Sequence, residues 1–278
     1  MTDNKKPVVL GGAIGTAVGA AIMGFVARRL WRRPSDWLPP SGDPPHPDWK
    51  VGENQPPPFS GEEMMALDPS ELGGARAYPL VISAVVPRPI AFVCTLSAAG
   101  VRNLAPFSYF GAMSHDPPHV CIGICRSRSK ATGKKDTLAN ILATKEFTLN
   151  MMSEWFVESA NHTCGEFDDD VDELSLAGLT PLPSLKVAPP RVKESSVHLE
   201  CKLVHTYEVR NEYGVVTATI VIGRVVMFHV HKEVAGKTPS GNVIVDFQRY
   251  KPVSRLGGNT YGRTAGTFDL PRPDRKIA

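Results

Sequence analysis

Two long apolar runs in the C-terminal half decide which fold classes this sequence can adopt. They cover Val197–Val209 and Val215–Val230 and are rich in β-branched residues. The segment Asn211-Glu212-Tyr213-Gly214 between them has the composition of a tight turn. Because β-branched and aromatic residues favour strands, this arrangement predicts a long antiparallel β-hairpin.

Shorter runs of the same character lie earlier in the chain and are bounded by prolines and glycines, the pattern of strands separated by turns. Helices are expected after Asp136, which we interpret as an N-cap, and at Val157–His162. Mostly antiparallel strands with helices packed outside predict a mainly β fold with peripheral helices, closed into a barrel. The shorter strands are expected at Tyr78–Val86, Ile90–Leu96, Phe107–Met113, Val120–Cys125 and Phe147–Met151.

The N-terminal region contains a candidate transmembrane helix. Residues Val8–Ala27 form twenty consecutive positions without a charge. At 1.5 Å per residue, a helix of that length spans roughly 30 Å, the hydrocarbon thickness of a bilayer. Gly11, Gly15 and Gly19 recur on one face, as in membrane helices that pair with each other. These glycines also lower the hydrophobicity of the segment, so a peripheral helix is the alternative.

Charges on either side of this segment predict its orientation. Lys5 and Lys6 precede it, whereas four arginines follow it, and basic residues stay preferentially on the cytosolic side. We therefore expect a single-pass anchor with the C-terminal part facing the cytosol. An anchor of this kind is compatible with the endoplasmic reticulum and with the mitochondrial outer membrane. The arginines are Arg28, Arg29, Arg32 and Arg33.

Proline marks the boundary between this segment and the rest of the chain. Nine of the 25 prolines lie between Pro34 and Pro58, and the stretch up to about Ala75 has few β-branched residues to bury. It is interpreted as a semi-extended linker. The expected organisation is an anchor with basic flanks (1–34), a Pro-rich linker (35–75), a folded domain (76–265) and a C-terminal tail (266–278).

Charge and cysteine content exclude several functional classes. The 31 basic and 28 acidic residues give a net charge of +3, too small an imbalance to predict a nucleic-acid partner. The five cysteines are odd in number and include no CxxC pair, so neither a disulfide framework nor a zinc site is predicted.

His229 and His231 share a strand face, but no third ligand accompanies them, so we predict no metal site. The acidic run Asp168–Glu173 is interpreted as a solvated helix start.

One segment combines hydroxyl groups, a glycine turn and backbone donors. Thr95 and Ser97 precede Gly100, and the stretch Asn103–Ser108 follows. We expect Pro106 to keep this stretch from pairing as an ordinary strand. A loop of this kind can hold an anion or the polar edge of a ring, and a plain β-turn is the alternative.

A second segment concentrates positive charge before the helix expected at Asp136. Five basic side chains lie within ten residues, interleaved with Ser127 and Ser129. Cations beside the N–H groups of a helix N-terminus suit a phosphate monoester; a solvated basic loop is the alternative. A P-loop is excluded, because Arg128 stands where that motif needs a glycine. The basic residues are Arg126, Arg128, Lys130, Lys134 and Lys135.

Together with the rest of the chain, these segments resemble the flavin reductase-like family of FMN-binding split barrels. The resemblance runs from about Tyr78 to Tyr261 and depends on the order and spacing of short motifs. They include Val86-Pro87-Arg88-Pro89-Ile90-Ala91, Thr95-Leu96-Ser97, Asn103-Leu104-Ala105-Pro106-Phe107-Ser108-Tyr109-Phe110, Asp116-Pro117-Pro118, Lys135-Asp136-Thr137-Leu138-Ala139-Asn140, Gly178-Leu179-Thr180, Ile222-Gly223-Arg224-Val225 and Arg255-Leu256-Gly257-Gly258.

The resemblance implies a split β-barrel that binds FMN, usually at a homodimer interface. Tyr261 would close over the ring or the second substrate, and no side chain is assigned as a catalytic acid or base. The residues that would line the isoalloxazine ring and ribityl chain are Thr95, Ser97, Asn103, Ala105 and Ser108. Those that would hold the phosphate are Arg126, Ser127, Lys135 and Thr137.

The function implied is that of an FMN-dependent oxidoreductase, which passes hydride or electrons from a small donor to a small acceptor such as free flavin. NAD(P)H is a candidate donor. Many flavin reductases of this type that use NADH carry Gly-Asp-His where this chain has Val216-Thr217-Ala218. FMN binding is therefore favoured over nicotinamide use. The alternatives are an FMN-dependent oxidase or dehydrogenase of another substrate, and a non-catalytic electron-transfer module.

Overall fold

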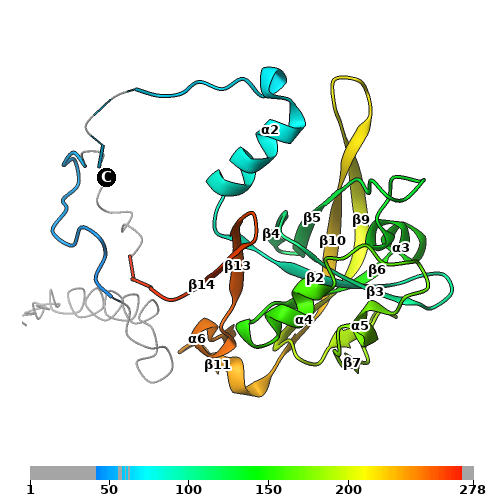
Figure 1. The fold of residues 1–278 in the computed structure, drawn as a ribbon. Coiled ribbons are helices and arrows are strands. Elements are labelled where there is room, and N and C mark those ends of the chain that lie inside the picture. The colour runs from blue at the N-terminus through cyan, green and yellow to red at the C-terminus, as the bar shows by residue number, and fades with distance from the viewer. Residues whose placement is uncertain (1–41, 56–57, 60, 62, 271–278) are drawn as a thin grey trace, which may run out of the picture.

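The computed structural model describes residues 42–55, 58–59, 61 and 63–270 (Figure 1). The transmembrane helix expected at Val8–Ala27 lies outside these residues. Within the described ranges, no helix is both long and apolar enough to cross a membrane.

The centre of the fold is one seven-stranded sheet with the strand order β3-β2-β6-β9-β10-β5-β4. Every neighbouring pair in it is antiparallel, which confirms the mainly β prediction. Its strands are β2 (Ala91–Leu96), β3 (Arg102–Phe107), β4 (Phe110–His115), β5 (Pro118–Cys125), β6 (Glu146–Met151), β9 (Val197–Arg210) and β10 (Val216–Val230).

Smaller elements surround this sheet. One short sheet has the strand order β1 (Arg88–Pro89), β13 (Val253–Gly257), β14 (Thr260–Arg263). Two further sheets have two strands each: β7 (Pro181–Leu182) with β8 (Arg191–Val192), and β11 (Ala235–Lys237) with β12 (Val243–Val245). The helices are α2 (Pro69–Ala84), α3 (Asp136–Thr144), α4 (Val157–His162), α5 (Glu173–Leu176) and α6 (Phe247–Tyr250), with 3₁₀ turns η1 (Glu154–Phe156) and η2 (Lys232–Val234).

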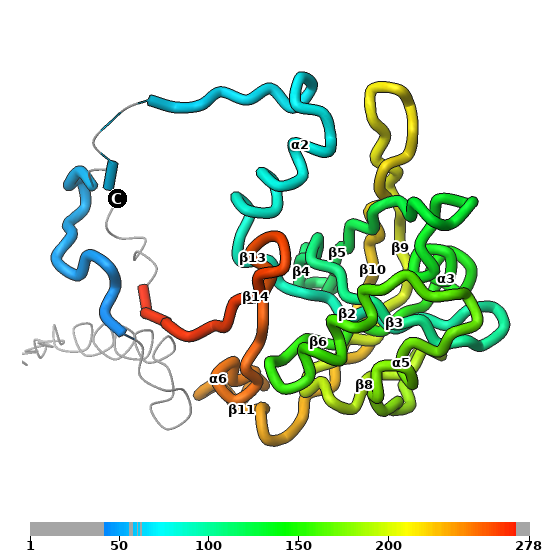
Figure 2. The backbone as a smooth tube through the Cα atoms, in the orientation of Figure 1, coloured from blue at the N-terminus to red at the C-terminus, as the bar shows by residue number. Residues whose placement is uncertain are grey.

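The predicted long hairpin is confirmed. Strands β9 and β10 pair from Arg210 opposite Val216 to Val197 opposite Val230. Their turn end extends beyond the rest of the sheet (Figure 2). Their other end supplies the middle of the sheet, where β9 also pairs with β6 and β10 with β5.

Strand β2 is buried on both faces of the sheet. Successive side chains of a strand point to opposite faces. Val93 lies in one buried cluster with Ile122, Phe147 and Val221, whereas Phe92 lies in a second cluster with other apolar side chains. Because both faces are buried, β2 has a continuous apolar sequence rather than an alternating one.

The prediction of a strand at Tyr78–Val86 is wrong, because residues 78–84 belong to helix α2. Asp68 caps the helix by accepting a hydrogen bond from Ser70 N, and Pro69 occupies its first turn. Gly73, with a φ of 69°, kinks α2 between this start and the apolar residues near its end, so the start signals account for the first turn only. Helix α2 contacts β13 and stands beside the sheet (Figure 1). It begins inside the stretch that was interpreted as linker.

Pro106 does not prevent pairing, contrary to expectation. It belongs to β3 and lies opposite Phe92 of β2. Because β3 is an edge strand, the missing N–H of a proline can face away from the sheet. The strand expected at Phe107–Met113 is accordingly two strands, β3 and β4. At the next helix, Lys135 is the N-cap of α3 and Asp136 is its first residue.

Candidate functional site

A cavity of about 150 Å³ lies where β3, the basic loop after β5 and the loop after α4 meet. Ser129, Lys130, Phe167 and Glu173 are among its lining residues. Five of the ten residues that the sequence predicts as cofactor contacts also line it: Asn103, Ala105, Ser127, Lys135 and Thr137.

The polar floor of this cavity is a fixed hydrogen-bond network around Asn103. Its Oδ1 accepts from Thr137 Oγ1 at 2.7 Å and from Thr95 Oγ1 at 3.3 Å. Asn140 Nδ2 donates to Thr95 Oγ1 at 3.0 Å. Thr95 is fully buried, so it supports Asn103 from beneath and does not line the cavity. Side chains tied into such a network are preorganised for binding.

Glu173 completes this network from the other side, a contact that the sequence analysis did not predict. Its Oε2 accepts from Asn103 Nδ2 at 2.5 Å and from Leu104 N at 2.5 Å. The acidic run was interpreted as a solvated helix start, and Asp172 does cap α5 by accepting from Ser175 N. Glu173, the first helical residue, is instead turned inward and only 6% exposed.

Burial raises the pKa of Glu173 to about 7, although its bonds from Leu104 N and Asn103 oppose the rise. A raised pKa means that the folded protein binds a proton that the unfolded chain has released. Stability should therefore fall as the pH rises from about 4.5, the ordinary value, to about 7.

We expect Glu173→Gln to abolish this fall in stability with pH. The amide oxygen can still accept the hydrogen bonds from Asn103 and Leu104, and it carries no charge. The variant should match the wild type near pH 4 and exceed its stability at pH 8, measured by urea unfolding at several pH values. Glu166→Gln, another acidic residue that lines the cavity, serves as the control. Parallel pH profiles for wild type and Glu173→Gln would contradict the assignment.

The basic loop forms the other end of the cavity. Lys130 Nζ pairs with Asp136 at 3.1 Å and with Asp169, so the charge of this lysine is already neutralised. Lys135 stands at the N-terminus of α3, and within the described ranges its side chain makes no hydrogen bond or ion pair. Lys135 is therefore the cation that remains available to an anion at this end.

Arg126 does not line the cavity. A Cβ on Gly133 would lie 2.6 Å from Arg126 Nε, so the guanidinium packs directly over that glycine. Gly133 also has a φ of 69°, a backbone conformation that favours glycine. The loop thus depends on Gly133 for its shape.

Three further predicted residues have local partners outside the cavity. Ser97 Oγ accepts from Val101 N at 3.1 Å in the β2–β3 turn, and Ser108 Oγ accepts from Arg88 Nε at 3.5 Å. Tyr261 OH donates to Asn161 Oδ1 at 2.8 Å. Their assignment as flavin contacts stays a prediction.

No group of three or more His, Cys, Asp or Glu side chains in the described part of the chain is placed to hold a metal ion. His229, considered above as a ligand, instead hydrogen-bonds through Nε2 to Glu200 Oε1 at 2.6 Å.

Comparison with known proteins identifies the family. Residues 83–254 match the model of the flavin reductase like domain. The uncharacterized protein YwrF of Bacillus subtilis is 37% identical over 210 residues, which cover 76% of this chain and 100% of YwrF.

Solved structures agree with this match. Component B of nitrilotriacetate monooxygenase from Bacillus cereus is 30% identical, with a TM-score of 0.70, covering 76% of this chain and 100% of that protein. A split-barrel protein of Shewanella frigidimarina is 24% identical, with a TM-score of 0.61, and the match covers 73% of this chain and 96% of that protein. At this identity the match supports the fold alone. The chain therefore belongs to the flavin reductase-like family of split barrels, whose members are flavin-linked oxidoreductases.

Proposed function

We propose that the domain binds FMN in this cavity and passes hydride or electrons through it to a small acceptor. The observation that carries the proposal is the polarity of the cavity: Asn103 and Thr137 provide neutral polar groups at one end, and Lys135 beside the first turn of α3 provides a cation at the other. A terminal phosphate monoester suits the cationic end. FMN has such a group, whereas the phosphates of FAD are internal.

The chain's part is to bind and orient the cofactor. Bound FMN would supply the chemistry by accepting hydride and releasing electrons. Asn103 would present a fixed amide, because two hydroxyls and Glu173 hold it in place. Ser127 Oγ, which accepts from Lys130 N at 3.2 Å, would contribute to the phosphate end.

The cavity in one chain is small for a cofactor site, and the family resemblance implies a homodimer. At about 150 Å³ it is smaller than the roughly 300–1,000 Å³ typical of small-molecule sites. We propose that a second copy completes the site. Three further predicted contacts lie outside the cavity, so they would contact FMN either from the second copy or where the cofactor extends beyond the cavity. They are Ser97, Ser108 and Tyr261.

NAD(P)H is one candidate donor. The chain has Val216-Thr217-Ala218 at the start of β10, in place of the Gly-Asp-His described above. An FMN-dependent oxidase or dehydrogenase of another substrate, or an electron-transfer module, is the second candidate. Steady-state assays with NADH and NADPH separate these functions.

The purified full-length protein is expected to be yellow and to release FMN rather than FAD on denaturation. The reason is the single cationic end of the cavity, which matches a terminal phosphate. The measurement is a visible spectrum followed by chromatography of the released flavin. Colourless protein that takes up no added FMN would overturn the proposal.

Lys135→Ala is expected to raise the Kd for FMN roughly tenfold, from the lower end (about 1.5 kcal/mol) of the range for a charge-assisted hydrogen bond. Titration with flavin fluorescence as the signal measures this change. Arg128→Ala is the matched control, because Arg128 is an exposed cation of the same loop that does not line the cavity. Equal effects of both substitutions would mean that the loop acts only through its net charge. Arg126→Ala tests the remaining predicted phosphate contact.

We further propose that residues 8–27 anchor the domain in a membrane with the domain facing the cytosol. The support is the uncharged stretch followed by four arginines. Release of the full-length protein by an alkaline wash, or protection of its domain from protease in intact organelles, would contradict this topology.

A further inference from the structure

The cavity that we propose for FMN is lined by three acidic side chains that differ in burial. Glu173 is buried, whereas Asp136 is half-buried and Glu166 is exposed. Asp136 also pairs with Lys130 at 3.1 Å. Because burial disfavours the charged form of an acid, Glu173 is the acid of this lining that is most easily neutralised.

The two carboxyl oxygens of Glu173 have different surroundings. Oε2 accepts from Asn103 Nδ2 and from Leu104 N, each at 2.5 Å. Oε1 accepts no hydrogen bond from any residue that the structure describes. A proton on this carboxyl would therefore be carried by Oε1, because two donors already occupy Oε2. Neutral Glu173 then has one O–H donor for a group inside the cavity that it lines.

Charged neighbours leave Glu173 close to an even balance between its two forms. Burial raises the pKa of Glu173 to about 7, Asp136 at the start of α3 adds to the rise, and Lys130 in the basic loop opposes it. The preceding residue, Asp172, is paired with Arg102 of β3. Both forms of Glu173 are therefore populated at neutral pH, and a ligand can shift the balance.

The charge of the cavity lining depends on which form is present. The lining contains two lysines, Lys130 and Lys135, and three acids. With Glu173 ionised the acids exceed the lysines by one charge, whereas with Glu173 neutral the two signs balance. An anionic ligand is repelled less by the balanced lining. A ligand that fills the cavity also displaces water from the carboxyl, which further disfavours the charged form.

We propose, on the basis of the function proposed above, that FMN binds to the form of the cavity in which Glu173 is neutral. Protein in which this residue is ionised would then take up one proton at Oε1 on binding FMN. The new O–H would donate to an acceptor of the ligand, and the flavin ring has carbonyl oxygens that can accept. Because binding and proton uptake are linked, the affinity for FMN should fall as the pH rises through neutrality.

Isothermal titration calorimetry in buffers of different ionisation enthalpy measures the proton uptake. The sample is full-length protein freed of bound flavin, and the probe is FMN. At pH 8 we expect uptake of up to about 0.9 proton per FMN, the fraction of Glu173 that is ionised in the free protein when its pKa is about 7. The phosphate of FMN cannot produce this signal, because contact with a cation favours its ionised form and releases protons.

Glu173→Gln isolates the contribution of this residue. Its amide supplies an acceptor and a donor in place of the neutral acid, but it does not titrate near neutral pH. Uptake by the variant should therefore be lower than that of the wild type at pH 8 and equal to it near pH 5.5. The ratio of the wild-type Kd to the variant Kd should rise by up to about tenfold between pH 6 and pH 8. Glu166→Gln, which removes the exposed acid of the same lining, should take up protons like the wild type.

The outcomes separate this inference from the function on which it depends. Wild-type protein that binds FMN at pH 8 without net proton uptake would overturn the inference and leave the proposed function intact. Equal uptake by the wild type and a folded Glu173→Gln variant would overturn it as well, and circular dichroism verifies folding. If FMN does not bind at any pH, the proposed function fails, and the inference fails with it.

Discussion

Replacement of Phe147 by alanine is expected to lower the free energy of unfolding by about 3–5 kcal/mol, the range for truncating a buried phenylalanine. The side chain is fully buried on β6. Its ring extends to β10, where a Cβ on Gly223 would lie 2.4 Å from Cζ. The ring thus occupies the space that the glycine leaves, and its removal opens a cavity between two strands that do not pair with each other.

Urea unfolding followed by circular dichroism measures this loss. Phe228→Ala is the matched control, because Phe228 lies on β10 but is 56% exposed, and surface substitutions usually change stability by less than about 0.5 kcal/mol. Comparable losses for both variants would show that the Phe147 ring is not part of the core.

Glu200→Ala is expected to cost about 3–5 kcal/mol, as when one partner of a buried charge network is removed. The side chain is fully buried. It accepts hydrogen bonds from Leu185 N at 2.8 Å, Lys186 N at 2.5 Å and His229 Nε2 at 2.6 Å. The substitution would leave two backbone N–H groups and one imidazole without their acceptor and would detach the loop before β8 from β9.

The pH dependence of stability provides a second measurement on the same residue. Burial raises the pKa of Glu200, but the bonds from Leu185 N, His229 and Lys186 N outweigh burial and hold the pKa below its ordinary value. A lowered pKa gives stability that is present above about pH 4.5 and is lost as the pH falls through the folded value. Glu200→Ala should therefore show a shallower loss of stability in acid. Glu208→Ala, an exposed residue of the same strand, should unfold like the wild type at every pH.

Much of the fold could be predicted because it depends on local sequence patterns. The β9–β10 hairpin and helix α4 follow from runs and turn residues that are adjacent in the chain. Helix α2 was missed because its start signals at Asp68 and Pro69 lie within a stretch whose composition indicates a linker, and because the kink at Gly73 separates them from residues 78–84. Pro106 was misjudged because edge or centre position in a sheet is a property of the whole fold.

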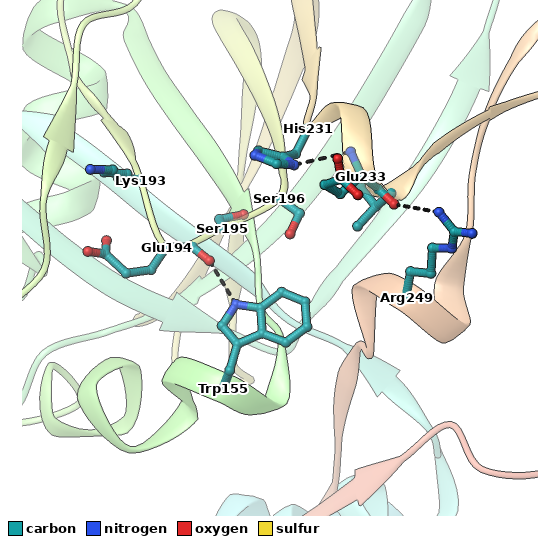
Figure 3. Close-up of a pocket in the computed structure, with 9 residues that line it drawn as sticks. Trp155, Lys193, Glu194, Ser195, Ser196, His231, Glu233 and Arg249 are labelled. Carbon is teal, nitrogen blue, oxygen red and sulfur yellow. Dashed lines mark hydrogen bonds between the residues drawn. The ribbon is translucent and has the colours of Figure 1, made fainter.

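The candidate site likewise contains residues that could be predicted from the sequence and residues that could not. The resemblance to the family pointed to Asn103, Ser127 and Lys135, and all three line the cavity; their role as flavin contacts stays a prediction. The inward position of Glu173 could not be predicted, because it depends on α5 packing against β3, about 70 residues away in sequence. An open hollow on the surface, lined by Trp155, Ser196 and Arg249 among others (Figure 3), was also missed, because its walls come from four separate parts of the chain.

The pairing of β5 with β10 has a consequence for how this protein is made. Roughly 90 residues separate the end of β5 at Cys125 from the start of β10 at Val216. At about 5–20 residues per second, a ribosome needs roughly 5–20 s to cover that distance. During this time β5, with its apolar side chains Val120, Ile122 and Ile124, has been synthesised but the strand that pairs with it has not. One edge of β5 is therefore unpaired in the nascent chain for several seconds, and unpaired strand edges favour aggregation.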